Sequence, residues 1–233
     1  MENQVEKIEK KNELLGKLLK AVFHDIRNPL HNLLAFVDMF MNASDEEERK
    51  EIMDGMTRSG KALAGLLDNF SLWSGELMND SKEFSEVVLD SVVQKILALF
   101  SQQIAKKKVD VGIMFRDVRF ISHERTVFFV VGNIIYNAIK FSKEGGAILI
   151  YASELKEKTR ILISDSGVGM SKEQIPELFT EGNTTPGTNG ESGTGLGLSL
   201  AKSFLEEIGG TISVESTLGK GASFTIDFPK QVF

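Results

Sequence analysis

The sequence contains no cysteine among its 233 residues, and only one tryptophan, two tyrosines and four prolines. Without cysteine the chain can form neither disulfides nor thiolate metal sites. No apolar run approaches the ~18–20 residues that a membrane-spanning helix needs, and no signal peptide opens the chain. We therefore expect a soluble, cytoplasmic chain, which is compatible with its being one part of a longer, membrane-anchored protein.

An excess of positive charge is also missing. The net charge is −6, which argues against a nucleic-acid binder that works by neutralising phosphates. Hydrophobic residues make up 42% and charged residues 26%, which is ordinary for a soluble globular protein. The length is enough for one large domain or two ordinary ones.

The first third of the chain, from about Glu6 to Met78, is almost entirely helix-forming and shows no strand-like alternation. Asn42 can end one helix, and Ser44 with Glu47 forms a capping box that begins the next, which runs from about Glu46 to Leu77. Two antiparallel helices with wide apolar stripes cannot bury those stripes alone. The pattern therefore predicts a symmetric homodimer built around a four-helix bundle.

The pattern changes after a polar stretch, Gly75–Glu86, that is typical of a linker. Helical and strand-like segments then alternate, in the order helix Leu89–Lys108, strand Val109–Phe115, helix Ser122–Phe141, two β-rich runs, helix Leu196–Ile208 and a closing hairpin. This order favours an α+β layer domain with helices on one face of a mixed sheet. We place the helical domain at residues 1–84 and the α+β domain at residues 85–233.

Four segments of the second domain suggest chemistry. In "NIIYNAIKF", Asn133 and Asn137 share one helical face and Lys140 lies near it. Amide oxygens suit Mg²⁺ and a lysine can balance phosphate charge, although an ordinary polar helix face would also explain the pair. In "DSGVGM", Asp165 follows a strand, and Gly167 and Gly169 permit either a plain turn or close approach to a ligand.

The other two segments are rich in glycine. "GTGLGLSLAK" is a glycine-rich entry into a helix, where exposed N–H groups can bind an anion. Its spacing matches neither a dinucleotide fingerprint nor a Walker A loop. "NTTPGTNGES", before it, has the composition of a mobile lid or of a disordered connection.

Taken in order, these motifs carry a resemblance. N-x₃-N-A-x-K-F, D-x-G-x-G, L-F, G-T-G-L-G-L and G-G-T-I-x-V-x-S-x-x-G-K-G-x-S-F, over about Glu83–Pro229, strongly resemble the ATP-binding domain of sensor histidine kinases. That domain belongs to the superfamily of gyrase, the ninety-kilodalton heat-shock chaperone and the mismatch-repair ATPase. "AVFHDIRNPLHNLL" resembles the same family's H-box, the segment of a dimerising helical hairpin that carries the phosphorylated histidine.

The resemblance implies ATP and Mg²⁺ as cofactors. Asn137 then corresponds to the Mg²⁺ ligand and Asn133 to its partner in the metal site, while Lys140 contacts phosphate and Phe141 packs on adenine. Asp165 reads the adenine amino group, and Gly167 and Gly169 give the base room. The implied lid hinge, which places backbone N–H groups on the phosphates, comprises Gly193, Thr194, Gly195, Leu196 and Gly197.

Two positions depart from the family pattern. Phe179 resembles the aromatic of the family's F-box, but "ELFTEG" lacks the second aromatic of many relatives. Ala222 stands where many relatives have Thr or Ser, and it offers no hydroxyl for a polar contact near the adenine.

In the H-box, the resemblance implies that His24 is the phosphorylated nucleophile and that Asp25 holds one ring proton. Asn28, four residues after His24, would position water for the reverse, dephosphorylating reaction. Arg27 can meet phosphate, but a solvated arginine is the plainer interpretation. His31 and His123 are interpreted as ordinary surface histidines, with His31 a weak rival phosphoacceptor.

Together these residues predict a histidine kinase that phosphorylates His24 and passes the phosphoryl group to an aspartate of a response-regulator receiver domain. ATP-hydrolysing relatives carry a glutamate at position 133 as general base, and asparagine cannot deprotonate water. An ATPase clamp of the same superfamily and an inactive dimeric nucleotide-binding scaffold remain the alternatives.

Pro29 lies within the first predicted helix, where proline removes a backbone donor and leaves the Asp25 carbonyl without its helical partner. We expect this softened turn to let the helix flex as the ATP-binding domain and the partner protein alternate.

Overall fold

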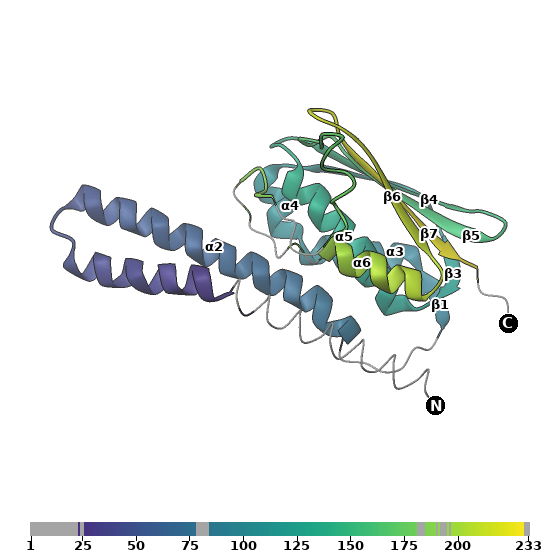
Figure 1. Ribbon diagram of the computed structural model, residues 1–233, viewed down its shortest axis with the longest axis horizontal. Coiled ribbons are helices and arrows are strands. Elements are labelled where there is room, and N and C mark those ends of the chain that lie inside the picture. Colours follow the sequence, from purple (N-terminus) through teal and green to yellow (C-terminus); the bar gives the residue numbers. More distant parts are fainter. Residues whose placement is uncertain are drawn as a thin grey trace. The chain divides into compact units, whose positions relative to one another are not determined.

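The computed structural model describes residue 23 and residues 26–77, 84–180, 185–189, 191, 195 and 197–230. The described residues form two compact units that divide near Ser71 and Leu72. The first unit contains a helical hairpin, and the second contains a mixed sheet with its helices (Figure 1).

The hairpin consists of a helix over residues 26–42 and helix α2 (Glu46–Leu77). The first helix ends at Asn42, as predicted, and the Asn42 amide donates to the Asp38 carbonyl at 2.7 Å. The predicted capping box is wrong by one residue, because α2 begins at Glu46 and Asp45 is therefore its N-cap. Asp45 Oδ1 accepts from the Glu48 amide at 2.8 Å, and Glu48 Oε2 accepts from the Ser44 amide at 3.0 Å.

The two helices of the hairpin approach closely where Phe36 lies against Gly55. A Cβ atom at Gly55 would lie 2.7 Å from Phe36 Cε1, so a larger residue here would require the Phe36 ring to shift. Several large apolar side chains of the hairpin are nevertheless exposed, including Phe23 (64%) and Leu34 (55%).

The second unit begins with strand β1 (Ser85–Val88), which starts inside the stretch predicted as a linker. It pairs antiparallel with β3 (Arg119–Ser122), a strand that the sequence analysis did not predict. Val87 lies opposite Phe120 in this ladder, and both side chains are buried. Four-residue strands are too short to show alternation, so this pairing becomes visible only when the buried partner is known.

The single helix predicted over Leu89–Lys108 is divided in the structure. Helix α3 (Leu89–Leu99) ends at Phe100, and α4 (Ser101–Lys107) begins after it. Phe100 is fully buried, and its ring centroid lies 5.3 Å from that of Tyr136. The break therefore places an aromatic side chain in the core.

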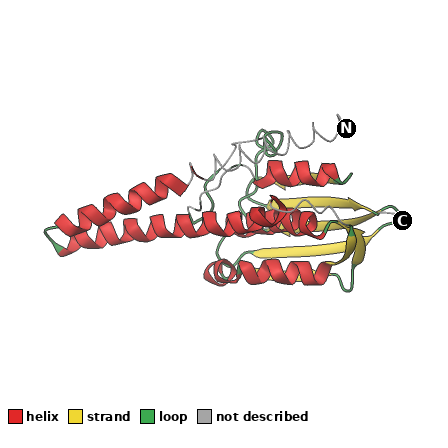
Figure 2. Cartoon of the chain, turned by 90° about the horizontal axis from the view of Figure 1, so that it is seen from below, coloured by secondary structure: helices red, strands yellow, loops and turns green. Residues whose placement is uncertain are grey.

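The main sheet has five strands in the order β2-β4-β5-β7-β6. β2 is parallel to β4 and the other neighbours are antiparallel, so the predicted mixed sheet is confirmed. The strands are β2 (Asp110–Met114), β4 (Ala147–Glu154), β5 (Lys158–Asp165), β6 (Thr211–Thr217) and β7 (Gly221–Pro229). Helices α5 (Glu124–Phe141) and α6 (Gly197–Glu207) pack against the sheet (Figures 1 and 2).

Side chains alternate across the sheet. Ile148 and Ile150 of β4 are buried, whereas Leu149 and Tyr151 between and after them are exposed. The helices α5 and α6 meet through Phe129 and Phe204, whose rings contact edge to face at 5.1 Å. The core of this unit therefore lies between the helices and one face of the sheet.

His123 is not the surface histidine that was predicted. It is only 7% exposed at the N-cap of α5, and its Nδ1 lies 2.8 Å from Thr126 Oγ1. Hydrogen bonding at the start of the helix explains a buried histidine without a catalytic role. Among the described residues, no helix is both long and apolar enough to cross a membrane.

Candidate functional site

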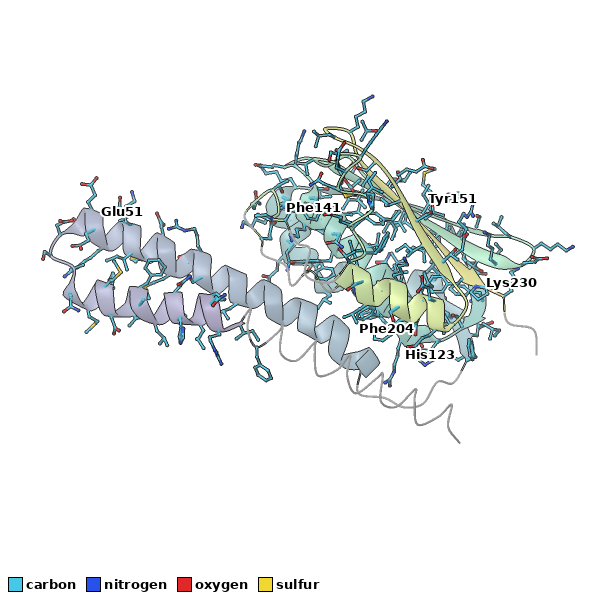
Figure 3. All side chains as sticks on the ribbon, in the orientation of Figure 1. Glu51, His123, Phe141, Tyr151, Phe204 and Lys230 are labelled. Atoms are coloured by element: carbon cyan, nitrogen blue, oxygen red, sulfur yellow. The ribbon has the colours of Figure 1, made fainter. Side chains whose placement is uncertain are left out.

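A cavity of about 340 Å³ opens in the second unit. Its walls come from separate parts of the chain, and Asn137 and Phe141 of α5 meet Asp165 at the end of β5. Phe141 is labelled in Figure 3, near the carboxyl end of α5. Further lining is contributed by Gly169, Leu178, Pro186, Leu198, Ala222 and Phe224. The cavity is therefore mostly apolar with a few polar groups, which is the usual composition of a small-molecule site.

Asp165 is held in place by the loop that follows it. Its Oδ1 accepts a hydrogen bond from the Gly167 amide at 2.8 Å. Burial raises the pKa of the Asp165 carboxyl, while hydrogen bonds from the amides of Gly167 and Ala222 oppose that rise. The carboxylate thus has a fixed orientation at the cavity wall, where it can accept from a ligand donor.

The glycines of this loop are required by close backbone contacts. A Cβ atom at Gly167 would overlap the Phe141 carbonyl, and one at Gly169 (φ +63°) would overlap the Thr217 carbonyl. Ser216 Oγ accepts from the Met170 amide at 2.9 Å and donates to the Gly221 carbonyl at 2.8 Å. The loop is therefore fastened to the β6–β7 turn, a role for Ser216 that the sequence analysis missed.

The two asparagines share a helix face, but the structure brings only Asn137 to the cavity. Asn133 is 4% exposed and donates from Nδ2 to the Phe129 carbonyl at 2.8 Å. Its Oδ1 faces Gly197, where a Cβ atom would overlap it. Asn133 therefore joins α5 to the start of α6.

Lys140 is 4% exposed and is not among the residues that line the cavity. Its Nζ lies 4.9 Å from the ring centroid of Phe141. Burial lowers the pKa of Lys140 to about 8; the charge of Glu191 opposes this and that of Lys107 adds to it. A proton on this buried amine is consequently sensitive to charge brought close to it.

Lys107 is a residue that the sequence analysis missed. It is 3% exposed, and its ammonium pairs with Glu191 at 2.7 Å. In the sequence it is one of three consecutive lysines, a pattern typical of a solvated charged surface. No local signal distinguishes it from Lys106 and Lys108, which are exposed.

The glycine-rich segments are described in part. Thr185 and Pro186 line the cavity, Gly195 adopts φ +68°, and Gly197 is the first residue of α6. The predicted hinge residues Gly193, Thr194 and Leu196 lie outside the described residues. Phe179, the predicted F-box aromatic, lies beneath Lys202, whose Nζ is 5.5 Å from its ring centroid.

The predicted H-box is also described in part. His24 and Asp25 lie outside the described residues, and so does the Asp25 carbonyl that Pro29 would affect. Arg27, Asn28 and His31 are exposed on the helix over residues 26–42, which includes Pro29.

Within the described part of the chain, no three His, Cys, Asp or Glu side chains are grouped so that they could hold a metal ion. The partly exposed amide of Asn137 at the cavity is the remaining hard donor of the predicted pair. One such oxygen fits Mg²⁺ that takes its other ligands from phosphates and water.

Two family models match this sequence. The His Kinase A (phospho-acceptor) domain matches residues 14–74. The Histidine kinase-, DNA gyrase B-, and HSP90-like ATPase family matches residues 122–232, which contain all the described residues of the cavity.

Curated relatives are similar over almost the whole chain. Sensor histidine kinase GacS of Pseudomonas protegens is 28% identical over 234 residues, which cover 94% of this chain and 25% of the relative. Sensor protein SrrB of Staphylococcus aureus is 28% identical over 232 residues, which cover 94% of this chain and 39% of the relative. The chain thus spans only a quarter to two-fifths of the length of these relatives.

Solved structures of histidine kinases are also similar to this chain. The catalytic domain of histidine kinase ThkA is 30% identical, with a TM-score of 0.56 over 64% of this chain and 96% of that domain. ThkA in complex with response regulator protein TrrA has a TM-score of 0.66 over 98% of this chain and 66% of that one. At 24% identity, the second likeness shows the fold alone.

Proposed function

Because this chain belongs to the histidine kinase family, we propose that it phosphorylates its own His24 from ATP and passes the phosphoryl group to an aspartate of a response-regulator receiver domain. The observation that carries this proposal is the cavity, where Asn137 and Phe141 of α5 meet Asp165 at the end of β5. Residues 1–84 would present the histidine and residues 85–233 would bind the nucleotide.

The cavity suits an adenine base. The Asp165 carboxylate is held by the Gly167 amide and is available to accept from the exocyclic amino group. Phe141 and the apolar lining, which includes Leu178 and Phe224, would cover the faces of the ring. Ala222 lies at the wall without a hydroxyl, so the base would depend on Asp165 for its recognition.

The phosphates would lie toward Asn137 and the start of α6. Asn137 Oδ1 would hold Mg²⁺, which when bound supplies positive charge beside the phosphates. Lys140 would add a second positive charge, and the glycines of residues 193–197 would offer backbone N–H groups. Asn133 would act through the α5–α6 contact rather than at the metal.

At the hairpin, one ring nitrogen of neutral His24 would attack the terminal phosphorus of ATP. The other ring nitrogen would keep its proton and donate it in a hydrogen bond to the Asp25 carboxylate. The bond to the bridging oxygen of ADP breaks as the bond to nitrogen forms. Asn133 cannot serve as a base for water, so His24 would be the acceptor. Asn28 would position water when the partner is dephosphorylated.

We also propose that two copies associate through the hairpin. Exposed apolar side chains occur at Phe23 and, along the helix over residues 26–42, at Leu30, Leu34 and Val37, with heptad-like sequence spacings of seven, four and three. Such a stripe is buried when two hairpins form a four-helix bundle.

The test is phosphorylation with γ-phosphate-labelled ATP and Mg²⁺. We expect an acid-labile, base-stable label that is lost in His24→Ala and kept in His31→Ala. Asp165→Asn should lose both the label and the binding of a fluorescent ATP analogue. Label that survives in His24→Ala would contradict the assignment. Steady phosphate release without label would favour an ATPase clamp, and failure to bind the analogue would favour a scaffold.

Transfer is tested by adding purified receiver domains to the labelled protein. A cognate receiver should take the label from His24 within seconds to minutes, and a receiver whose acceptor aspartate is replaced by asparagine should not. If no member of a broad panel takes the label, the transfer step of the proposal is wrong even though the kinase step stands.

A further inference from the structure

A buried ammonium lies behind the cavity, at the carboxyl end of α5. Lys107 Nζ donates to the Ile139 carbonyl at 2.9 Å and to the Lys140 carbonyl at 2.7 Å. These carbonyls belong to the last turn of α5, which ends at Phe141 and cannot satisfy them internally. A cation at the carboxyl end of a helix is also favoured by the helix dipole.

The same ammonium holds a second segment, residues 185–189 with Glu191, which we term the lid segment. Lys107 Nζ donates to Thr188 Oγ1 at 2.7 Å and pairs with Glu191 Oε1 at 2.7 Å. Thr188 Oγ1 in turn donates to the Ser142 carbonyl at 2.6 Å. Lys107 therefore links the end of α5 to a loop whose Thr188 lies 81 residues after Lys107 in the chain.

Glu191 pairs with Lys107 and also forms hydrogen bonds within the lid segment. Its Oε2 accepts from the Asn189 amide at 2.9 Å, and its carbonyl accepts from the Gly187 amide at 2.8 Å. Burial alone would raise the pKa of Glu191, but hydrogen bonds from Lys107 and from the amides of Glu191 and Asn189 hold that pKa below its ordinary value. The buried charge of Lys107 thus has an ionised partner, as a buried ammonium requires.

The lid segment approaches α5 more closely than a side chain would allow. A Cβ atom at Gly187 would lie 2.7 Å from Lys140 Cγ. The Thr188 amide donates to the Lys140 carbonyl at 3.1 Å, next to the Lys107 bond to the same oxygen. Thr185 and Pro186, directly before these contacts, form part of the cavity wall.

We propose that Lys107 is a positioning residue for the nucleotide cavity, which fastens the lid segment to the carboxyl end of α5 and so fixes the Thr185–Pro186 wall. Lys107 does not touch the nucleotide. It acts through Thr188 and Glu191, and its removal would let the wall move away while the residues of the phosphoacceptor helix stay intact. This inference rests on the proposed nucleotide site, but the fastening itself does not depend on what the cavity binds.

The first experiment measures amide hydrogen exchange in the full chain without nucleotide. In Lys107→Met we expect the Gly187 and Thr188 amides to exchange at least about tenfold faster than in the wild type. The Val168 amide, which donates to the Phe141 carbonyl at 3.2 Å outside the lid segment, serves as an internal reference and should be unchanged. Lys106→Met is the matched control, since Lys106 is the exposed neighbour on the same helix.

The second experiment measures autophosphorylation kinetics. We expect Lys107→Met to raise the KM for ATP about tenfold and to change kcat at saturating ATP less than about threefold, since uniform binding is lost. A loss confined to kcat, or equal kinetics in Lys107→Met and wild type, would overturn the proposal. So would a Thr188 amide that is unprotected in the wild type.

A variant in the lid segment distinguishes loss of the Lys107–Thr188 contact from a general loss of folding. Thr188→Val removes one acceptor of Lys107 but leaves its bonds to α5 and its pair with Glu191, so it should raise KM in the same direction even if Lys107→Met unfolds. In the double variant the combined effect should be smaller than the sum of the two single effects, because both variants remove the Lys107–Thr188 contact. Additive effects would contradict a shared role. If the wild type binds no ATP analogue, the proposed function fails, whereas the exchange experiment still decides the role of Lys107.

Discussion

The helical hairpin and the α/β unit bury their apolar side chains to different extents. In the described part of the hairpin, Ala43 and Ile52 are buried, whereas Leu30, Leu34 and Met41 are among the side chains left exposed. In the α/β unit, by contrast, Phe100, Phe129 and Phe228 are completely enclosed. The α/β unit therefore has a core of its own, while the hairpin presents an apolar stripe that needs a second surface.

The largest effect is expected in the core of the α/β unit. Phe129→Ala should cost about 3–5 kcal/mol of unfolding free energy, because the ring is fully buried and joins α5 to α6. Denaturant unfolding of the full chain measures this loss. Phe84→Ala, at a side chain that is 36% exposed, is the control and should cost much less. Equal losses would mean that this core does not set the stability of the unit.

A substitution on the exposed apolar stripe of the hairpin should weaken the association of two copies rather than the folding of the chain. Leu34→Glu would place an unpaired carboxylate in the predicted dimer interface and should weaken association about 100-fold, or about 3 kcal/mol. Light scattering over a range of protein concentrations measures this change. Asn32→Glu adds the same charge two residues away on the exposed helix and should leave the dimer intact. A wild type that is monomeric at high concentration would refute the dimer.

Nucleotide affinity should depend on pH through Lys140. With a pKa of about 8, its amine is charged below that pH and loses its proton above it. Affinity for an ATP analogue should therefore be constant from pH 6.5 to 7.5 and fall by up to about tenfold per pH unit above 8. Titration of Lys140→Met should give weaker but pH-independent binding. A wild-type profile that stays flat to pH 9 would show that this amine does not meet phosphate.

The same pKa shift has the opposite consequence for folding. Between pH 8 and the ordinary lysine value of 10.5, the folded chain has released a proton that the unfolded chain retains. Raising the pH across that window therefore favours the folded state as far as Lys140 is concerned. Stability and nucleotide affinity should consequently change in opposite directions with pH.

The smallest effect is expected at an ion pair that joins β5 and β7, two interior strands of the sheet. Arg160 donates from Nε and Nη2 to the two oxygens of Asp227, at 2.7 and 2.8 Å, between neighbouring strands. The Arg160 side chain is 41% exposed, and Lys158 also donates to Asp227, at 2.6 Å. Because the carboxylate keeps a partner, Arg160→Ala should cost less than about 1 kcal/mol of unfolding free energy. Denaturant unfolding at low and high salt measures it, and a loss as large as that of Phe129→Ala would contradict this ranking.

Much of the fold could be predicted because its signals are local. Alternation along Ala147–Glu154 and the spacing of the helix before Phe141 follow directly from periods of two and 3.6 residues. The predictions are wrong where contacts with residues distant in the sequence determine the local structure. β1 and β3 are too short to alternate, Phe100 breaks a helix to fill the core, and His123 is buried by the elements around it.

In the candidate site, too, some features follow from local sequence patterns and others depend on contacts between distant segments. The glycines near Asp165 could be predicted from the sequence, since a glycine-rich turn after a strand has a local pattern. That Gly167 lies against the Phe141 carbonyl, and that Gly169 lies against the Thr217 carbonyl, requires the folded chain. The four-residue spacing of the two asparagines predicts a shared helix face, but it could not reveal that Asn137 lines the cavity whereas Asn133 contacts the start of α6.

The sequence by itself determined the types of the longer helices and strands, the order of the motifs and the family, because these depend on residue spacing along the chain. Only the tertiary structure decided which of three adjacent lysines is buried. Lys107 is enclosed because the carbonyls of α5 and the carboxylate of Glu191 converge on it from positions that are distant in the sequence. An ammonium can be buried only where such acceptors meet, and spacing along the chain does not reveal that place.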